Sequence, residues 1–299
     1  MNGNFRPLFE KAGRRGPRRY AVAGAAGEEV LRAVSKAVKI GLMHPILIGP
    51  ESSIRKMASG LKMSLYGMTL IGAAHDQDIA DQAAQLVSEG NADAIMKGNV
   101  STPVVLRSIL EPKYGLRSGR LLSHIAYMDV PSYTKMFVIT DSGMVIRPTL
   151  EQKVEILRNA IGFIRKLGVL HPKIAVLAAN EKVSPQMPET SDGVELVRLA
   201  AQGLFGSVVL EGPMALDMAF SKESAKIKNI RSRVAGSPDI LLVPDIASGN
   251  IFAKGLVYLA GAKISGLVVG ARIPIVLISR AEKAETWLRS IALANIISK

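Results

Sequence analysis

Three turns in the sequence have the residue types that bind anions: each combines hydroxyl or glycine residues with Lys or Arg directly after an apolar run. Their candidate residues are, in chain order, Lys97, Thr102 and Arg107; Ser248, Gly249, Asn250 and Lys254; and Ser279 with Arg280. Hydroxyls and backbone N–H groups can donate to phosphate oxygens, while basic side chains neutralise their charge. Each turn alone can equally be an ordinary capped connection between a strand and a helix. Together they predict a site that binds phosphates and stabilises developing negative charge.

The sequence offers little for covalent or metal chemistry. Cysteine is absent, which excludes disulfides, thiolate metal ligands and a Cys nucleophile. The four histidines are scattered without metal-ligand spacing, at His44, His75, His124 and His171. The patterns G-x-G-x-x-G, G-x-S-x-G and H-E-x-x-H do not occur. We therefore expect no metal and no cofactor.

The elements that must position these turns alternate between apolar runs of strand length and amphipathic helices. Strands are expected at residues 20–23, 45–48, 68–71, 92–96, 122–127, 134–139, 174–177, 208–210, 240–243, 266–269 and 275–277. Helices are expected at 28–40, 54–61, 76–89, 150–167, 192–202, 249–259 and 281–297. This alternation predicts an α/β fold with a mostly parallel sheet. In such sheets ligands bind beyond the carboxyl ends of the strands, where the three turns fall.

The charge and length of the chain narrow its possible partners. Its 299 residues carry a net charge of +13, with 48% hydrophobic residues. Six basic side chains lie within residues 1–20 against Glu10, which we interpret as a mobile basic arm. The excess charge suits a phosphate-rich small ligand, and also a nucleic acid or a solvated basic surface. Neither a bilayer-spanning run nor a signal peptide is apparent, so we expect a cytoplasmic protein that binds no membrane.

Four ordered blocks in the second half resemble the phosphate acetyl/butyryltransferase family. E-G-P at 211–213, with Asp217 and Ala219, is similar to the family's D-G-P-x-x-x-D-x-A. The run from Lys228 to Gly236 resembles K-x-x-x-S-x-V-A-G. Residues 244–254 resemble P-D-x-x-S-G-N-x-x-x-K, and residues 274–280 resemble P-x-x-x-x-S-R. The segments 141–144, 150–156, 178–183 and 186–190, and the turn at 96–98, favour the butyryl branch.

The resemblance implies two α/β/α domains with a cleft between them, an isocitrate/isopropylmalate dehydrogenase-like architecture, and a homodimer. We place the domains at residues 1–118 plus 267–299 and at 119–266. The implied activity interconverts acyl-CoA and phosphate with acyl phosphate and CoA, with CoA as substrate. The alternatives are an NAD(P)-dependent dehydrogenase of the same fold and a non-catalytic binding protein that retains the fold. A nucleic-acid binder is a further, minor alternative.

We expect Arg280 to balance the charge on phosphate and on the tetrahedral oxyanion, and Ser279 to position the thiol or carbonyl. The phosphoryl group would be held by Ser248, Gly249, Asn250 and Lys254. CoA or acyl phosphate would be bound with the help of Lys97, Thr102 and Arg107, and Lys228 is a further substrate-binding candidate. The acetyl branch has an aspartate seven residues after the serine, where this chain has Thr286. Glu285 is the candidate base in its place, although a neighbouring helix position faces another direction.

Overall fold

The chain forms two compact units, each built around a sheet. A computed structural model describes residues 5–279 and 282–298. One unit contains Met1–Arg120 and Ser265–Lys299, and the other contains Leu121–Ile264. The boundaries expected from the sequence, after residue 118 and before residue 267, lie two residues from these.

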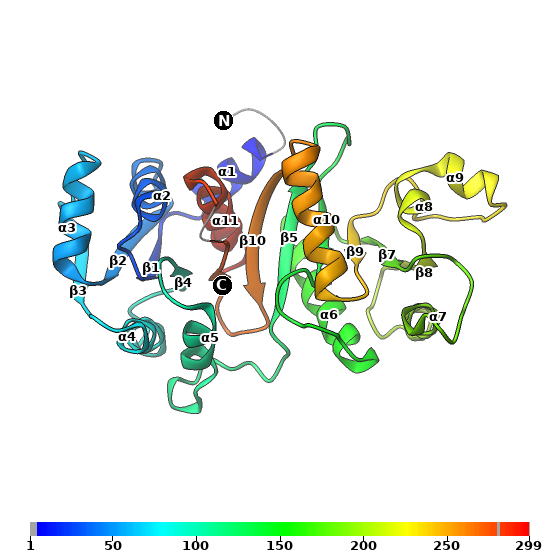
Figure 1. The fold of residues 1–299 in the computed structure, drawn as a ribbon, viewed down its shortest axis with the longest axis horizontal. Helices are drawn as coiled ribbons and strands as arrows, with labels where there is room; N and C mark the ends of the chain where they lie inside the picture. The colour runs from blue at the N-terminus through cyan, green and yellow to red at the C-terminus, as the bar shows by residue number, and fades with distance from the viewer. Residues whose placement is uncertain (1–4, 280–281, 299) are drawn as a thin grey trace. The chain divides into compact units, whose positions relative to one another are not determined.

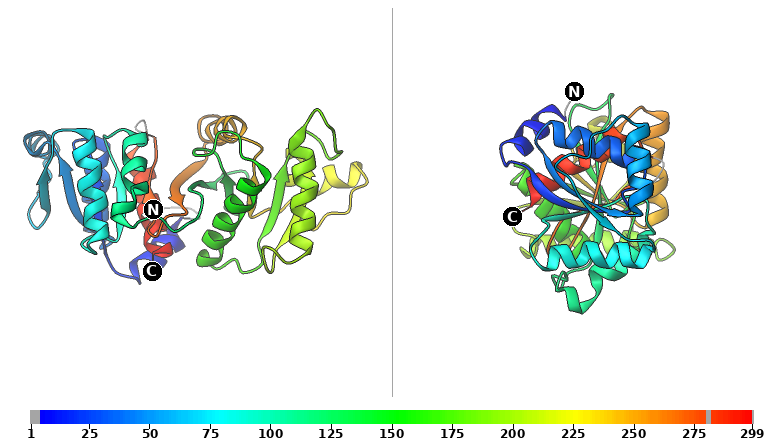
Figure 2. Two further views of the ribbon diagram at one scale, coloured as in Figure 1. Left: turned by 90° about the horizontal axis from the view of Figure 1, so that it is seen from below. Right: turned by 90° about the vertical axis from the view of Figure 1, so that its left-hand side faces the viewer.

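The first unit has strands in the order β3-β2-β1-β4-β11-β10. Their bounds are Thr69–Gly72, Met43–Gly49, Arg18–Ala23, Ala94–Lys97, Ile275–Val276 and Lys263–Val269. All neighbours are parallel except β10 and β11, which are antiparallel. Its helices are α2 (Glu28–Lys39), α3 (Glu51–Gly60), α4 (Asp76–Ser88), α5 (Thr102–Leu110) and α11 (Ala284–Ile297), with the short turn η1 (Pro112–Tyr114). In Figures 1 and 2, α2 and α11 cover one face of this sheet, and α4 and α5 cover the other.

The second unit has the strand order β5-β6-β9-β7-β8. Their bounds are Ser123–Asp129, Phe137–Thr140, Ile240–Leu242, Lys173–Leu177 and Val209–Met214. Only β5 is antiparallel to its neighbour; β6, β9, β7 and β8 run parallel. The helices are α6 (Leu150–Leu167), α7 (Pro188–Ala201), α8 (Leu216–Phe220), α9 (Lys222–Ile227) and α10 (Ile246–Leu259), with α6 and α7 on the opposite face from α10 (Figure 1). The predicted α/β fold with a mostly parallel sheet is confirmed.

The interpretation of residues 1–20 as a mobile arm is wrong for the part that the structure describes. Residues Arg6–Gly13 form helix α1, which packs against α11, and β1 follows at Arg18. Phe5 and Ala12 are buried, and the Arg15 guanidinium donates to the Ser298 carbonyl oxygen at 3.0 Å. The interpretation considered only the basic side chains of this segment. The apolar surface of Phe5 and Ala12 is buried in the fold, and its burial stabilises the ordered segment.

The C-terminal helix α11 is anchored in the first unit by polar contacts as well as by apolar packing. The buried Tyr20 hydroxyl on β1 donates to Asn295 Oδ1 at 2.6 Å, and Asn295 Nδ2 donates to the Leu42 carbonyl at 2.7 Å. Burial raises the pKa of Tyr20, so the phenol stays protonated and keeps this bond.

Within the described residues, no helix has both the length and the apolar character needed to cross a membrane.

Candidate active site

Two of the three predicted turns lie at the same edge of the first unit. Strands β4 and β11 are parallel neighbours, with Ile95 opposite Ile275 and Met96 opposite Val276. Their carboxyl ends therefore leave the sheet side by side, which brings the 97–102 turn and Ser279 to one edge. Ser279 is exposed there. Arg280 lies outside the described residues, so its predicted place beside Ser279 remains a prediction.

Lys97 holds the shape of its own turn. Its side chain is buried, and Nζ donates to the carbonyl oxygens of Gly98 and Val100, each at 3.0 Å. An ammonium group removed from water needs such acceptors, because burying it unpaired would cost several kcal/mol. Its ammonium thus contacts the backbone of its own turn, and its expected part in substrate binding stays a prediction.

The Lys97 turn also depends on two glycines. The Gly98 N–H donates to the Ala23 carbonyl at 2.7 Å, and the Asn99 N–H donates to the Gly24 carbonyl at 2.7 Å. A Cβ atom on Gly98 would lie 2.3 Å from the Gly24 oxygen. Gly24 itself has a φ of +77°, which glycine adopts without strain. The two strand-end turns of β1 and β4 therefore interlock through their backbones.

Thr102 and Arg107 lie on α5, the helix that continues from the Lys97 turn. Thr102 is the first residue of α5 and is partly buried, while Arg107 is exposed one turn further on. The Ser101 N–H donates to Asp76 Oδ2 at 2.8 Å, which caps the helix start from a neighbouring element. Thr102 therefore lies at the start of α5, close in sequence to the end of β4, and the binding roles predicted for Thr102 and Arg107 stay predictions.

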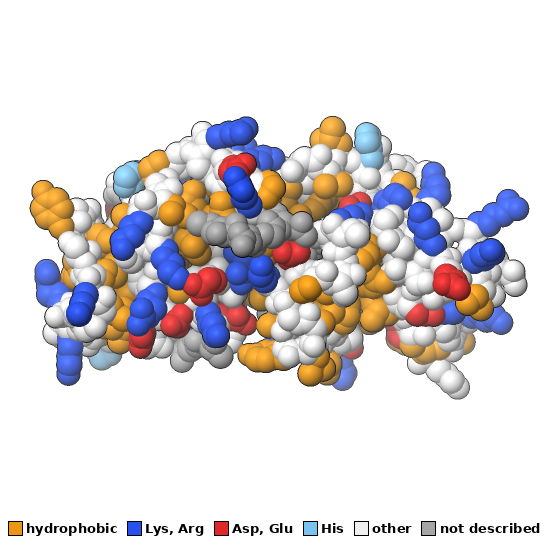
Figure 3. All heavy atoms as spheres, turned by 90° about the horizontal axis from the view of Figure 1, so that it is seen from above, with side chains coloured by type: hydrophobic (Ala, Val, Ile, Leu, Met, Phe, Trp, Pro, Cys, Tyr) orange, Lys and Arg blue, Asp and Glu red, His pale blue; other side chains and the backbone are white. Residues whose placement is uncertain are grey.

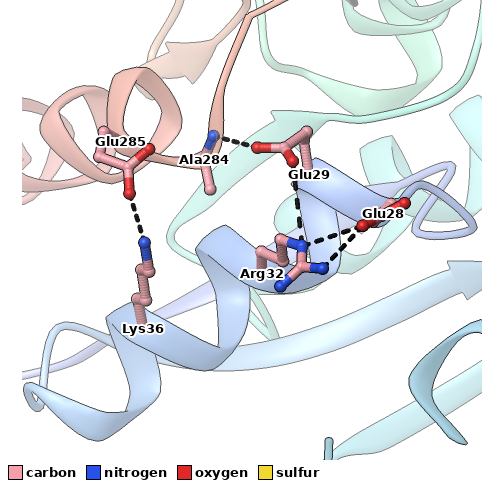
Figure 4. A network of polar contacts seen from close by, with 6 residues as sticks. All are labelled: Glu28, Glu29, Arg32, Lys36, Ala284 and Glu285. Carbon is pink, nitrogen blue, oxygen red and sulfur yellow. Dashed lines mark hydrogen bonds and ion pairs between the residues drawn. The ribbon is translucent and has the colours of Figure 1, made fainter. Parts of the chain in front are cut away.

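Glu285, the candidate base, takes part in an ion pair in the structure. Its carboxylate forms an ion pair with the Lys36 ammonium on α2, and the two side chains are about half exposed (Figure 4). The hydrogen bond from Lys36 lowers the pKa of Glu285. Beside it, Glu29 Oε2 accepts from the Ala284 N–H at 2.6 Å. Glu285 thus fastens the start of α11 to α2, which is a structural task.

Thr286 stands where the acetyl branch has an aspartate. It is buried, and its hydroxyl donates to Glu282 Oε2 at 3.1 Å. Glu282 in turn follows Ser279 closely, because the Glu282 N–H donates to the Ser279 carbonyl at 3.2 Å. Glu282, which is partly buried, is thus joined to Ser279 by a backbone hydrogen bond.

We expect Glu285→Gln to lower the free energy of unfolding and to leave kcat within about twofold of the wild type. An exposed pair contributes under about 1 kcal/mol. Because the folded-state pKa of Glu285 is lowered, that contribution is present above the unfolded pKa of about 4.3 and is lost as the pH falls through the folded value. Urea denaturation at several pH values, beside kcat, checks this. Lys36→Met should lose the same stability, whereas a collapse of kcat in Glu285→Gln would restore Glu285 as the base.

In the second unit, the predicted Ser-Gly-Asn turn lies inside the first turns of a helix. Helix α10 begins at Ile246, three residues before the predicted start, because Asp245 caps it. Asp245 Oδ1 accepts from the Ser248 N–H at 2.8 Å and from the Ser248 hydroxyl at 2.9 Å. The hydrogen bond from the Ser248 backbone is the main reason that the pKa of Asp245 is lowered. Ser248 therefore completes a capping box, and it remains exposed.

Gly249 and Asn250 join the start of α10 to the turn that follows β6. A Cβ atom on Gly249 would lie 3.0 Å from both Cα and Cβ of Ser142 and 2.7 Å from Val243 Cγ2. Asn250 Nδ2 donates to the Ser142 carbonyl at 3.4 Å. Since β6 and β9 are parallel neighbours, the turn at 141–144 and the start of α10 share one edge of the sheet.

The two predicted lysines of this unit differ in their surroundings. Lys254 is exposed on α10 and forms no ion pair with any described residue. Lys228 Nζ donates to Glu181 Oε1 at 2.7 Å and to Asp217 Oδ1 at 3.1 Å. The hydrogen bond to Glu181, then that to Asp217, raises the pKa of Lys228. Lys254 can therefore meet an anion directly, whereas Lys228 is already neutralised by two carboxylates.

The sequence interpretation gave no role to His124 and Ser142, which lie at the same edge. His124 Nδ1 is 3.1 Å from Ser142 Oγ, and Asp141 Oδ2 accepts from the His124 N–H at 3.0 Å. Burial lowers the pKa of His124, and the negative charge of Asp141 opposes this only in part. The Asp-Ser-Gly triplet directly after a buried strand was the available signal.

Basic side chains on the face drawn in Figure 3 are not gathered into one patch. Figure 3 shows one face, on which Lys and Arg side chains lie among acidic and apolar side chains. Among residues 5–279 and 282–298, no three His, Asp or Glu side chains are grouped so that they could hold a metal ion. The predicted binding residues thus form two groups of strand-end turns, one in each unit, with exposed hydroxyl, amide and basic side chains.

Comparison with known proteins finds relatives that match nearly the whole chain. The family described as phosphate acetyl/butaryl transferase matches residues 73–295. A phosphate butyryltransferase from Clostridium acetobutylicum is 36% identical over 298 residues, which are 100% of this chain and 99% of that protein. The crystal structure of a branched-chain phosphotransacylase from Enterococcus faecalis V583 has a TM-score of 0.82 and 30% identity. The match covers 94% of this chain and 99% of that chain.

A more distant likeness concerns the fold alone. A 4-hydroxythreonine-4-phosphate dehydrogenase from Burkholderia phymatum has a TM-score of 0.55 at 12% identity, with 94% of this chain and 98% of that chain covered. The predicted dehydrogenase-like architecture is thereby confirmed. By its fold, the chain belongs to the class of α/β proteins that includes the phosphotransacylases. Within that class, the chain belongs to the phosphate acetyl/butyryl transferase family.

Proposed function

We propose that the chain transfers acyl groups between CoA and phosphate. In the CoA-consuming direction, the thiolate sulfur of CoA attacks the carbonyl carbon of an acyl phosphate, and a tetrahedral oxyanion forms. The carbon–oxygen bond to phosphate then breaks, which yields a thioester and inorganic phosphate; the thiol proton leaves to a base or to solvent. In reverse, a phosphate oxygen attacks the thioester. The strongest support is the full-length relationship to a phosphate butyryltransferase.

The two groups of turns support a division of labour in this reaction. We assign the phosphoryl group to the start of α10, where Ser248, Asn250 and Lys254 offer hydroxyl, amide and ammonium donors. The N–H groups at the start of a helix and its dipole also favour negative charge. We assign thiol or carbonyl positioning to Ser279, charge stabilisation to Arg280, and contacts with CoA to Thr102 and Arg107. The reaction needs no cofactor, since CoA is itself a substrate.

The decisive experiment measures thiol release from acetyl-, propionyl-, butyryl- and isobutyryl-CoA with and without inorganic phosphate. Phosphate-dependent release with at least one of them is expected. The preferred chain length follows from the profile, because one methylene changes discrimination by only ~1–3 kcal/mol. Absence of phosphate-dependent release across the series would refute the proposed activity.

We further propose that the protein is a homodimer that contacts its second copy through α10. Tyr258 and Leu259, in the last turn of this helix, are 71% and 90% exposed. Two copies with a net charge of +13 each repel one another unless the contact surface is nearly uncharged. The last turn of α10 suits this condition, because the only charged residue of the helix, Lys254, precedes Tyr258 by about one turn and stays outside the contact.

Sedimentation equilibrium tests this assembly. We expect a dimer for the wild type and a monomer for the double variant Tyr258→Glu/Leu259→Glu, which places like charges opposite one another. Ile227→Glu, which changes an equally exposed apolar residue (73%) on α9, should stay dimeric. A monomeric wild type at micromolar concentration would contradict the proposal.

We also propose a cytoplasmic location. CoA and acyl phosphates are polyanions, and a bilayer strongly opposes the passage of charged groups. An enzyme that uses both is expected where they are made. Cell fractionation with antibody detection is the test, and recovery in an extracytoplasmic fraction would contradict it.

A further inference from the structure

His124, on β5, contacts the turn after β6 through both its backbone and its ring. Its N–H donates to Asp141 Oδ2 at 3.0 Å, and its carbonyl accepts from the Thr140 hydroxyl at 2.9 Å. Its ring packs on Gly143, where a Cβ atom would lie 3.0 Å from Cγ. Nδ1 is 3.1 Å from Ser142 Oγ. The backbone contacts fix the residue, and the ring contact alone reaches Ser142.

Ser142 in turn contacts the start of α10. Its Cα and Cβ leave no room for a side chain on Gly249, and its carbonyl accepts from Asn250 Nδ2. Ser142 is itself 97% buried, since its exposed fraction is 3%, so it acts through its neighbours. The exposed residue at the end of this series is Asn250, to which the proposed function assigns the phosphoryl group.

We infer that His124 is a positioning residue for phosphate: its ring holds Ser142, and Ser142 holds the Gly249–Asn250 segment at the start of α10. The inference rests on the proposed acyl transfer. It concerns the phosphate side of the reaction, and it predicts a change in the KM for phosphate with little change in the KM for acyl-CoA.

The lowered pKa of His124 agrees with this role, because a neutral ring can share a hydrogen bond with a hydroxyl without burying a charge. The charged group that acts on the ring is the Asp141 carboxylate. Its oxygens accept hydrogen bonds from the backbone N–H groups of His124, Gly143 and Met144. The ring is therefore left to Ser142.

The test uses His124→Phe, which keeps a ring over Gly143 and removes Nδ1, and His124→Asn, whose amide can take the place of Nδ1. His124→Phe should raise the KM for inorganic phosphate by about 3- to 10-fold, the effect of one neutral hydrogen bond. His124→Asn should stay within about twofold of the wild type. Ser142→Ala should match His124→Phe, and the double variant should be no worse than either, since both remove the same contact.

The chain contains a matched control. His171 Nδ1 is 2.6 Å from Ser207 Oγ in the same unit, but His171 precedes the amino end of β7, at the opposite edge of the parallel strands. His171→Phe should leave both KM values unchanged. Independent, multiplicative effects of His124→Phe and Ser142→Ala, or an unchanged KM for phosphate in both, would overturn the inference. An inactive wild type would instead refute the proposed function, so the two failures are distinguishable.

Discussion

Arg280→Ala is expected to lower kcat by about 10²–10³-fold, the usual cost of removing one donor that stabilises an oxyanion. The guanidinium can donate two parallel hydrogen bonds, and it remains charged at any pH the enzyme experiences. Its effect should appear in kcat more than in either KM, because the charge it balances develops in the transition state. Steady-state kinetics of phosphate-dependent thiol release measures this.

Two further variants make the Arg280 result specific. Arg280→Lys keeps the charge but loses the paired donors, so its kcat should fall between those of the wild type and Arg280→Ala. Arg55→Ala removes an arginine that pairs with Glu51 on the surface of α3, and it should leave turnover unchanged. Turnover by Arg280→Ala at the wild-type rate would remove Arg280 from the reaction.

Gly249→Ala should reduce both stability and activity. The added methyl group would lie 2.7 Å from Val243 Cγ2 and 3.0 Å from the Ser142 backbone, so the start of α10 has to move. Overpacking of this kind costs about 1–3 kcal/mol of unfolding free energy. A shift of the Asn250 amide by about 1 Å should lower kcat/KM for phosphate by about 10- to 100-fold. Urea denaturation and phosphate titration of the rate measure the two effects.

Gly255→Ala provides the control within the same helix. Apart from its chain neighbours and the backbone of α10 itself, no atom of the described residues lies within 4 Å of a Cβ atom at Gly255. Alanine is the better helix former by about 1 kcal/mol, so this variant should be more stable than the wild type and equally active. If Gly249→Ala were as stable and as active as Gly255→Ala, the close approach of α10 to Ser142 would carry no function.

The sequence predicted the α/β fold because strand and helix periods alternate along the chain, and period is a local property. It also predicted the turn after β4 and the position of Ser279 after β11, since a βα turn with glycine, hydroxyl and basic residues is recognisable within a few residues. The predicted Ser-Gly-Asn turn lies inside α10, and Arg280 lies outside the described residues. The family followed from ordered motifs, and the comparisons confirm it. The N-terminal segment was misread because its charges outnumber Phe5 and Ala12, which are buried only once α11 packs against α1.

What each predicted side chain contacts was decided by the tertiary structure. Whether the Lys97 ammonium faces solvent or its own turn depends on the interlocking of two loops, which no local pattern encodes. The pair Glu285–Lys36 joins residues 249 positions apart, and His124 meets Ser142 because β5 returns antiparallel to β6. Local patterns thus determined the elements and the turns, whereas the partner of each charge or hydroxyl depends on which distant strands and helices become neighbours.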